Sequence, residues 1–162
     1  MKRMNKTRWI VLIHWLVALG WTVFVFRLSV QTGEETAGLS LGIIDRLLSY
    51  LPWLTELFDY DLLHAWLRKG AHVAVFGILG LTMATVASIT ADTLRGSWKK
   101  AAVAVLLVCA ALAVMTEVVK LGVPGRHLDW DEAALNVVST WAGIGLVALL
   151  RRCFRKKHGV HG

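Results

Sequence analysis

The chain has 162 residues, a mean hydropathy of +0.58 and a formal net charge of +7. This length accommodates one small membrane domain, residues 1–162, with no room for a separate soluble one. The two cysteines, Cys109 and Cys153, lack metal-ligand spacing, which excludes a disulfide scaffold and a zinc site built on cysteine. No nucleic-acid motif accompanies the positive charge, so anionic lipid headgroups rather than nucleic acids are the expected partners.

Four apolar stretches, at residues 9–26, 70–91, 101–119 and 133–150, are predicted to be transmembrane helices. Each is close to the roughly 20 residues that a helix needs to cross a hydrocarbon core about 30 Å thick. The sequence therefore predicts an all-α membrane protein, built as a bundle of four transmembrane helices.

The first stretch follows a basic segment, as the apolar region of a signal peptide also does. It is longer than the roughly 7–15 residues of such a region. It also runs on into Phe24, Val25, Phe26 and Arg27 without a small-residue cleavage site. We therefore expect an uncleaved first span.

Charge type separates the segments between the spans. Most lysines and arginines lie in the N-terminal segment, in the loop at residues 92–100 and in the C-terminal tail. The acidic residues, apart from Asp92, lie in the other two loops or at the span ends that border them. Because basic residues are retained on the cytoplasmic side, both termini are expected in the cytoplasm and the acidic loops outside.

The loop at residues 27–69 is too apolar for a flexible linker. Its first apolar positions recur at spacings of three and four, which predicts an amphipathic helix; they are Leu41, Ile44, Leu47, Leu48 and Leu51. Pro52 should end this helix, and a second short helix is predicted from Trp53 to Trp66. We expect both to be interfacial helices that rest on the outer leaflet. Alternatively, they form a lid over a headgroup-binding site.

Polar side chains gather at the outer ends of the second, third and fourth spans. Ionisable groups beside hydrocarbon are costly unless they pair across helices or line a wet cavity. Positions 68, 69 and 72 are three or four apart and therefore share one helix face. We predict a single outer-face cluster that consists of Lys69, His72, Glu117, Arg126, Asp129, Asp131, Glu132 and Asn136. The alternative is that these are ordinary helix-end charges, or a network that only locks the helices together.

Two segments that carry this cluster resemble the signatures of the VanZ-like family. They are LRKGAHVAVFGILG (Leu67–Gly80) and TEVVKLGVPGRHLDWDEAALNVVSTWAG (Thr116–Gly143), and FRLSVQTGEETAGLS (Phe26–Ser40) is a weaker third match. The matching residues are Arg68, Lys69, His72, Glu117, Pro124, Gly125, Arg126, Asn136 and Gly143, with Ser29 and Gln31 in the third segment. The chain departs from the family pattern at Thr116, Lys120 and Glu132, where an acidic residue, a glutamine and an aspartate are usual.

The resemblance implies a multi-pass membrane protein of the bacterial cell envelope. Together with the charge pattern, it predicts a single domain in the cytoplasmic (inner) membrane with its site on the extracytoplasmic face. The family is associated with low-level resistance to teicoplanin-type lipoglycopeptide antibiotics at the cell envelope. One acid fewer and one lysine more make this pocket more positive than that of a typical member.

The first functional hypothesis is a binding protein whose outer-face pocket holds an anionic membrane lipid or a lipid-linked wall precursor. Arginine is the best bidentate donor to a phosphate group. The candidate binding residues are Arg68, Lys69, His72, Glu117, Lys120, Arg126, Asp129, Glu132 and Asn136. No cofactor is expected.

The alternative hypothesis is a small intramembrane enzyme that modifies a lipid or glycan headgroup, with His72 and Glu117 as acid and base. The sequence contains no complete nucleophile–base motif. No metal is expected, because His72, Glu117 and the loop carboxylates lack a recognised ligand spacing. A further alternative is that the protein has a purely structural role, either in a larger envelope assembly or as an oligomer. Its small-residue contact faces would then be Gly77–Gly80 and Gly143–Gly145.

Overall fold

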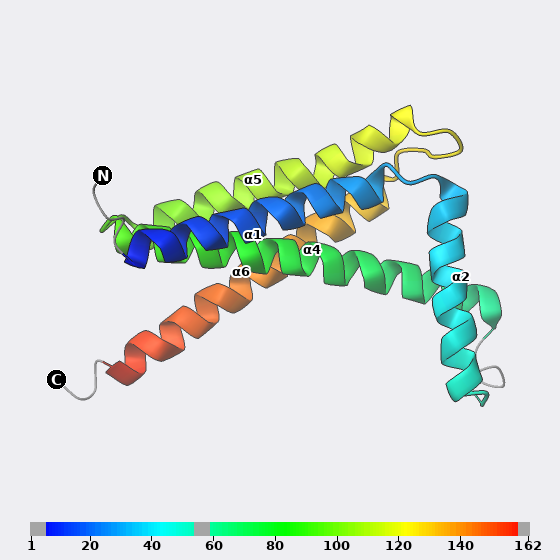
Figure 1. Ribbon diagram of the computed structural model, residues 1–162, viewed down its shortest axis with the longest axis horizontal. Coiled ribbons are helices and arrows are strands. Elements are labelled where there is room, and N and C mark those ends of the chain that lie inside the picture. The colour runs from blue at the N-terminus through cyan, green and yellow to red at the C-terminus, as the bar shows by residue number, and fades with distance from the viewer. Residues whose placement is uncertain (1–5, 54–58, 159–162) are drawn as a thin grey trace.

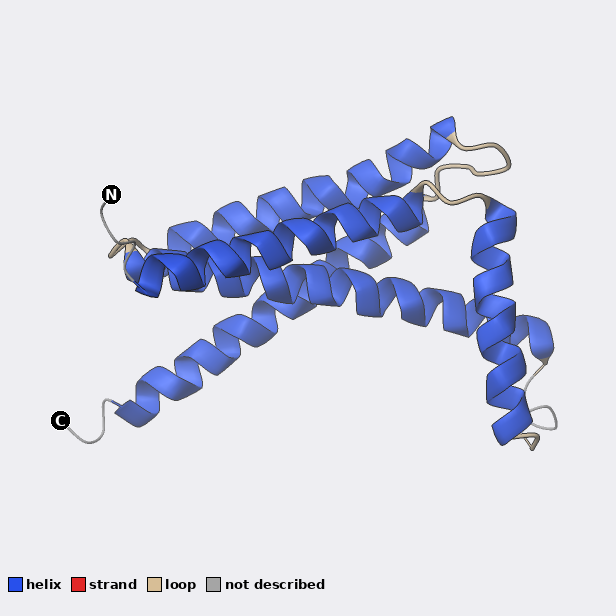
Figure 2. Ribbon diagram, viewed as in Figure 1, coloured by secondary structure: helices blue, strands red, loops and turns tan. Residues whose placement is uncertain are grey.

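A computed structural model describes residues 6–53 and 59–158, and all regular structure in these ranges is helical (Figure 2). The helices are α1 (Lys6–Ser29), α2 (Gly33–Tyr50), α4 (Tyr60–Thr93), α5 (Trp98–Val119) and α6 (Trp130–His158), with a 3-10 turn η1 (Lys120–Gly122) after α5. Of these, α1, α4, α5 and α6 are long and apolar enough to cross a membrane. The predicted all-α class and the four predicted spans are confirmed.

The four long helices run beside one another, and α2 crosses one end of the bundle at a steep angle (Figure 1). The two chain ends lie at the opposite end of the bundle from α2 (Figure 1). Helix α6 lies against α4 and α5 near α2 and then diverges from them toward the C-terminus. The crossing helix and the interhelical loops after α1 and α5 therefore share one end of the molecule.

Glycines bring α4 and α6 into backbone contact where they cross. A Cβ atom at Gly80 would overlap the backbone of Thr140, and one at Gly143 would overlap the backbone of Gly77. Small residues permit such close approach between membrane helices. Of the small-residue faces expected at Gly77–Gly80 and Gly143–Gly145, the chain therefore uses Gly80 and Gly143 for its own α4–α6 crossing, whereas a Cβ at Gly145 would meet nothing within 4 Å.

Helix α1 is held against the bundle mainly by apolar packing. Val25 of α1 is buried with Phe76 and Leu79 of α4 and Ala113 of α5. The indole Nε1 of Trp21 also donates a hydrogen bond of 3.0 Å to the carbonyl oxygen of Val75. Most other large side chains of α1 are exposed and apolar, as the lipid-facing surface of a membrane helix requires.

Helix α2 begins with a capping box and ends just before Pro52. Thr32 Oγ1 accepts from the backbone N–H of Glu35, whose carboxylate accepts from the backbone N–H of Thr32. Ile44 is fully buried, which confirms the predicted apolar face at this position. The helix ends at Tyr50, as expected from the following proline.

The prediction of a separate second loop helix, Trp53 to Trp66, is wrong for the residues from Tyr60 onward, which belong to α4. Helix α4 begins at Tyr60 and continues without interruption through the whole second span. No proline or glycine stands between Tyr60 and Lys69, so nothing in the sequence ends the helix before the apolar stretch. The rest of that prediction falls on Trp53, which lies in a turn, and on residues 54–58, which are outside the described residues.

Candidate functional site

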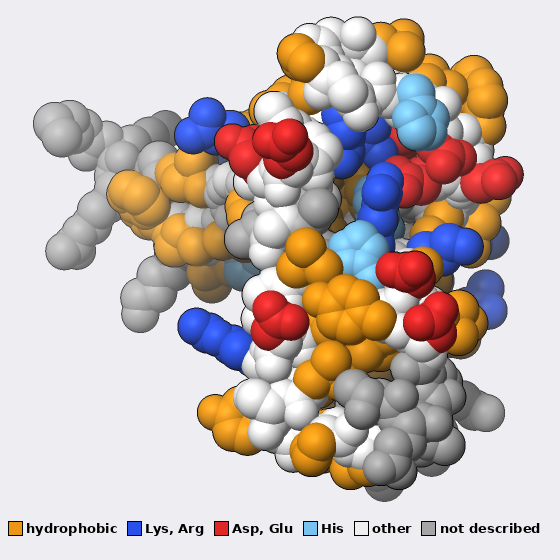
Figure 3. All heavy atoms as spheres, turned by 90° about the vertical axis from the view of Figure 1, so that its right-hand side faces the viewer, with side chains coloured by type: hydrophobic (Ala, Val, Ile, Leu, Met, Phe, Trp, Pro, Cys, Tyr) orange, Lys and Arg blue, Asp and Glu red, His pale blue; other side chains and the backbone are white. Residues whose placement is uncertain are grey.

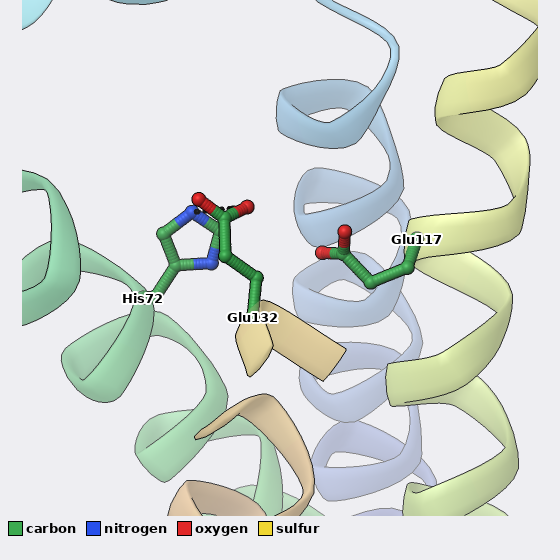
Figure 4. A group of neighbouring side chains, drawn as sticks. All are labelled: His72, Glu117 and Glu132. Carbon is green, nitrogen blue, oxygen red and sulfur yellow. Dashed lines mark ion pairs between the residues drawn. The ribbon is translucent and has the colours of Figure 1, made fainter. Parts of the chain in front are cut away.

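Charged and histidine side chains gather in a hollow at the end of the bundle where α2 crosses (Figure 3). Three helices contribute the centre of this group: His72 comes from α4, Glu117 from α5 and Glu132 from the first turn of α6 (Figure 4). The carboxylate of Glu117 points toward the other two side chains.

Lys120 joins the two carboxylates. Its Nζ lies 2.7 Å from both carboxylate oxygens of Glu117 and 2.7 Å from Oε2 of Glu132. Lys120 is 2% exposed and Glu117 is 1% exposed. Burying such charges is tolerable only when they are paired and hydrogen-bonded. Since an ammonium group has three donors, Lys120 makes its full set of hydrogen bonds inside the network.

Asn136 links Glu117 to His72. Its Nδ2 donates to Glu117 Oε1 at 3.1 Å, and its Oδ1 lies 3.0 Å from Nδ1 of His72. Because the amide oxygen can only accept, the hydrogen of a neutral His72 lies on Nδ1. Nε2 of His72 then carries a lone pair, and it lies 3.8 Å from Oε2 of Glu132.

Arg68 and Asp129 hold Glu132 from two other directions. Arg68 Nη2 donates to Glu132 Oε1 at 2.6 Å. Asp129 accepts the backbone N–H groups of Asp131 and Glu132 at 2.9 and 3.2 Å, so it caps the N-terminus of α6. The cap fixes the first turn of α6, from which Glu132 reaches into the network.

A tight turn places Arg126 beside α2. The backbone N–H of Arg126 donates to the carbonyl oxygen of Val123 at 3.1 Å, and Gly125 has a φ of 73°. Proline at the second position and glycine with positive φ at the third are typical of a type II turn. Arg126 Nη1 lies 3.4 Å from Thr36 Oγ1 of α2, and no carboxylate of residues 6–53 or 59–158 forms an ion pair with it.

Two cavities meet at this end of the bundle. The smaller, of about 120 Å³, is lined mostly by polar and charged residues, and the larger, of about 540 Å³, is mainly apolar. Both are lined by Thr36, Arg68, Lys120 and Arg126, so they adjoin along these side chains. The smaller is also lined by Gly33, His64, Gly125, His127, Asp129 and Glu132. The larger is also lined by side chains of α1, α2 and α4, among them Val25, Leu28, Ile43, Trp66, His72 and Phe76.

Two polar atoms beside the smaller cavity have no hydrogen-bond partner among the described residues. They are Nε2 of His64 and Nε of Arg68, and both atoms are buried. A buried donor or acceptor without a partner costs about 1–3 kcal/mol. These atoms, together with Arg126, give the smaller cavity unused hydrogen-bonding capacity.

A family model described as VanZ/LLP1 matches residues 14–151. The chain belongs to the VanZ/LLP1 family. Neither the curated proteins nor the solved structures gave a match to this chain. The resemblance drawn from the three sequence segments is therefore confirmed, and this VanZ/LLP1 protein is a multi-pass membrane protein by its four apolar helices.

The structure brings most of the predicted site residues of this VanZ/LLP1 protein together. Six of them form one hydrogen-bonded network, called the polar network below: Arg68, His72, Glu117, Lys120, Glu132 and Asn136. Asp129 joins through the helix cap and Arg126 through the shared cavity wall. Lys69 and Asp131 were expected in the cluster, but both are exposed and neither lines the two cavities.

His64 and Thr36 line the site but were missed in the sequence. His64 precedes Arg68 by four positions, so the same helical spacing that joined Arg68 to His72 would have included it. Thr36 gave no usable signal, because only the crossing of α2 over the bundle brings it to Arg126.

Ligand atoms of His72, Glu117 and Glu132 lie within 4.8 Å of one another, as they would around a metal ion. Lys120 Nζ, however, lies within hydrogen-bonding distance of both carboxylates. Its positive charge offsets part of the negative charge of the two acids and opposes the approach of a second cation. The donor set therefore fits an internal ammonium better than a metal.

Proposed function

We propose that this VanZ/LLP1 protein binds an anionic lipid, or a lipid-linked envelope precursor, at the end of the bundle that α2 crosses. The observation that carries the proposal is the pair of adjoining cavities, one polar and one apolar, with Arg126 on their shared wall. Such a pair matches an amphiphilic ligand, with an anionic head in one cavity and a chain in the other.

The charge balance of the site favours an anion. Within the polar network, the positive charges of Arg68 and Lys120 are matched by the negative charges of Glu117 and Glu132. Arg126 adds a cation that has no such match among the described residues. A guanidinium group binds phosphate through paired N–H donors, and Arg68 Nε and His64 Nε2 offer further hydrogen bonds.

Lys120 contributes to this site indirectly. Because its three hydrogen bonds go to Glu117 and Glu132, it fixes the wall between the cavities rather than the headgroup itself. Glu117 lines neither cavity and has the same supporting role. Under the proposal, Arg126, Arg68 and His64 contact the ligand, while Lys120 and Glu117 hold the wall between the cavities in place.

We place the site on the extracytoplasmic face of the bacterial cytoplasmic membrane, with both termini in the cytoplasm and α2 along the outer leaflet. The basic end segments support this orientation. The native cysteines allow a direct test, since Cys153 is exposed near the end of α6 and Cys109 is buried. A membrane-impermeant maleimide should label Cys153 only after the cells are permeabilised. Labelling of Cys153 in intact cells would reverse the proposed orientation.

The binding proposal is tested by the lipids that co-purify with the protein. We expect the wild type to retain anionic lipid in mild detergent, and Arg126→Ala to retain about 10- to 100-fold less, because a charge-assisted hydrogen bond contributes about 1.5–3 kcal/mol. Lys69→Ala is the matched control, since it removes an exposed cation from the same end of the bundle. Equal retention by wild type and Arg126→Ala, measured by mass spectrometry, contradicts the proposal.

A link to lipoglycopeptide resistance follows if the ligand is a lipid-linked wall precursor. The bound precursor would be less accessible to the antibiotic. Producing the wild type should then raise the inhibitory concentration of teicoplanin, and Arg126→Ala at equal membrane abundance should not. An equal rise with both proteins would separate resistance from this site.

A further inference from the structure

His72 lines the apolar cavity, and its Nε2 makes no hydrogen bond among the described residues but lies 3.8 Å from Oε2 of Glu132. Asn136 Oδ1 accepts from Nδ1, and Asn136 itself is oriented by the hydrogen bond from its Nδ2 to Glu117. These two hydrogen bonds fix the tautomer of a neutral imidazole and leave the lone pair on Nε2. The side chain of His72 is 19% exposed and lines the larger cavity.

The arrangement of Glu117, Asn136 and His72 has the form of an oriented base. In catalytic triads, a third group holds the histidine so that its other nitrogen faces the substrate. Here the third group is the amide of Asn136, and Glu117 holds that amide. The other nitrogen, Nε2, lies 3.8 Å from the Glu132 carboxylate, and the His72 side chain lines a cavity large enough for a ligand.

We propose that Nε2 of His72 is a general base for hydrolysis of an acyl ester in the bound lipid. This inference rests on the proposed lipid-binding function and assigns its substrate class, an anionic lipid with an ester-linked acyl chain.

The location of His72 selects the bond. His72 lines the apolar cavity and not the polar one, whereas Arg68 and Arg126 line both. A phosphate held by the arginines therefore places the start of the lipid chain beside His72. In an acyl lipid, the ester lies at this boundary between the charged head and the hydrocarbon chain.

The reaction needs only water as a co-reactant. Nε2 takes a proton from water as the water oxygen bonds to the ester carbonyl carbon, and the carbonyl oxygen becomes an oxyanion. The oxyanion collapses, the bond from carbon to the alcohol oxygen breaks, and the leaving oxygen takes the proton back from Nε2. The products are a fatty acid and a lysolipid. Positive charge from Arg68 and Arg126 at the cavity junction stabilises the oxyanion.

Glu117 and Asn136 are positioning residues in this mechanism. Glu117 is buried, lines neither cavity and is bound by Lys120, so it has no path to the substrate. The expectation that His72 and Glu117 act together as acid and base is thus replaced by one in which His72 serves in both steps. Asn136 sets the tautomer of His72, and Glu117 sets the orientation of Asn136.

The test uses purified full-length protein in phosphatidylglycerol vesicles prepared in water enriched in oxygen-18. We expect the wild type to release fatty acid with one oxygen-18 in its carboxylate. His72→Gln, which keeps a donor toward Asn136, should lower the rate about 10²–10⁴-fold while retaining lipid as the wild type does. His72→Ala should recover activity when imidazole is added, which a structural role for His72 does not predict.

Asn136→Leu tests the positioning role. The substitution should lower kcat and displace the pH profile of the rate. The mole fraction of phosphatidylglycerol that gives half of the maximal rate should change little, because the variant loses control of the His72 tautomer but not lipid binding. Asp131→Asn, at an exposed residue of the same helix, should keep the wild-type rate.

The outcomes separate catalysis from binding. If the wild type retains phosphatidylglycerol in an Arg126-dependent way but releases no labelled fatty acid, the catalytic proposal is wrong and the binding proposal stands. Product formation that survives His72→Gln also overturns the role of His72. If retention does not depend on Arg126, the proposed function fails, whatever product appears.

Discussion

Each end of the α4–α6 pair carries an arginine paired with an acidic residue, but the two ion pairs differ in burial. At the end crossed by α2, Arg68 binds Glu132 inside a network whose central residues, Glu117 and Lys120, are almost completely buried. At the other end, Arg151 binds Asp92 through both guanidinium nitrogens, and the Asp92 side chain is 61% exposed.

The surroundings of the two ion pairs also differ. Arg151 lies 5.2 Å from the centre of the Trp98 ring and contacts Ser88. It lines a groove of about 480 Å³ whose other walls include Leu81, Val147 and Leu150. The polar network borders the smaller cavity, which adjoins the larger, apolar one. One end therefore has the features of a helix anchor, and the other has those of a ligand site. Four predictions test this contrast.

The largest effect is expected for Glu117→Ala. It leaves the buried ammonium of Lys120 with a single carboxylate partner, Glu132. Removing one partner of a buried ion pair costs about 3–5 kcal/mol of unfolding free energy. Unfolding by SDS titration measures this loss. The double variant Glu117→Ala with Lys120→Met should recover much of it, and a double variant as unstable as the single one contradicts the account.

Gly143→Ala should have the second-largest effect on stability, because the crossing of α4 and α6 supports both ends of this helix pair. The added methyl group would overlap the backbone of Gly77, and overpacking of this kind costs about 1–3 kcal/mol. Gly145→Ala is the control on the same helix, since a Cβ there meets nothing within 4 Å. The melting temperature in detergent should fall for Gly143→Ala only. Equal melting temperatures for the two variants would show that the crossing is not tight.

Asp129→Ala should have a moderate effect confined to the site end. It removes the side-chain cap of α6, which is worth about 1 kcal/mol, and loosens the turn that carries Glu132. Hydrogen exchange should rise at the start of α6 and not near Arg151. Asp131→Ala changes an exposed acid of the same turn and should leave exchange unchanged. Exchange that rises equally at both ends would argue against a local cap.

The smallest effect is expected for Asp92→Ala at the opposite end. The carboxylate is largely hydrated, and solvent-exposed ion pairs contribute about 0–1 kcal/mol. Arg151 also keeps its contacts with Ser88 and Trp98. The melting temperature should change little, and the change should shrink further in high salt. A loss as large as that of Glu117→Ala would remove the contrast between the two ends.

The spans could be predicted from the sequence because apolar length alone determines them. The predicted stretch at residues 70–91 lies within α4, but the start of α4 at Tyr60 was missed. The charged residues between Tyr60 and Lys69 indicate where a helix leaves hydrocarbon, and they do not indicate where it ends. Only a backbone-breaking residue does that, and this segment has none.

The site was predicted in part, for a similar reason. Helical spacing correctly joined Arg68 to His72, and apolar surroundings correctly marked Glu117 and Asn136 as network residues. Spacing could not show that Lys120 makes all its hydrogen bonds inside the network. It also could not bring Thr36 to Arg126, since that contact depends on the direction in which α2 leaves α1.

Photo-crosslinking with a phosphatidylglycerol analogue, carrying a diazirine in its acyl chain, tests the central claim most directly. We predict labelling of the α1 and α4 segments that line the 540 Å³ cavity, around Val25–Leu28 and Trp66–Phe76. Unlabelled phosphatidylglycerol should compete with this labelling, and Arg126→Ala should abolish it, while Lys69→Ala should not. Labelling that is equally strong at the Arg151 groove and insensitive to Arg126→Ala would contradict a specific anionic-lipid site.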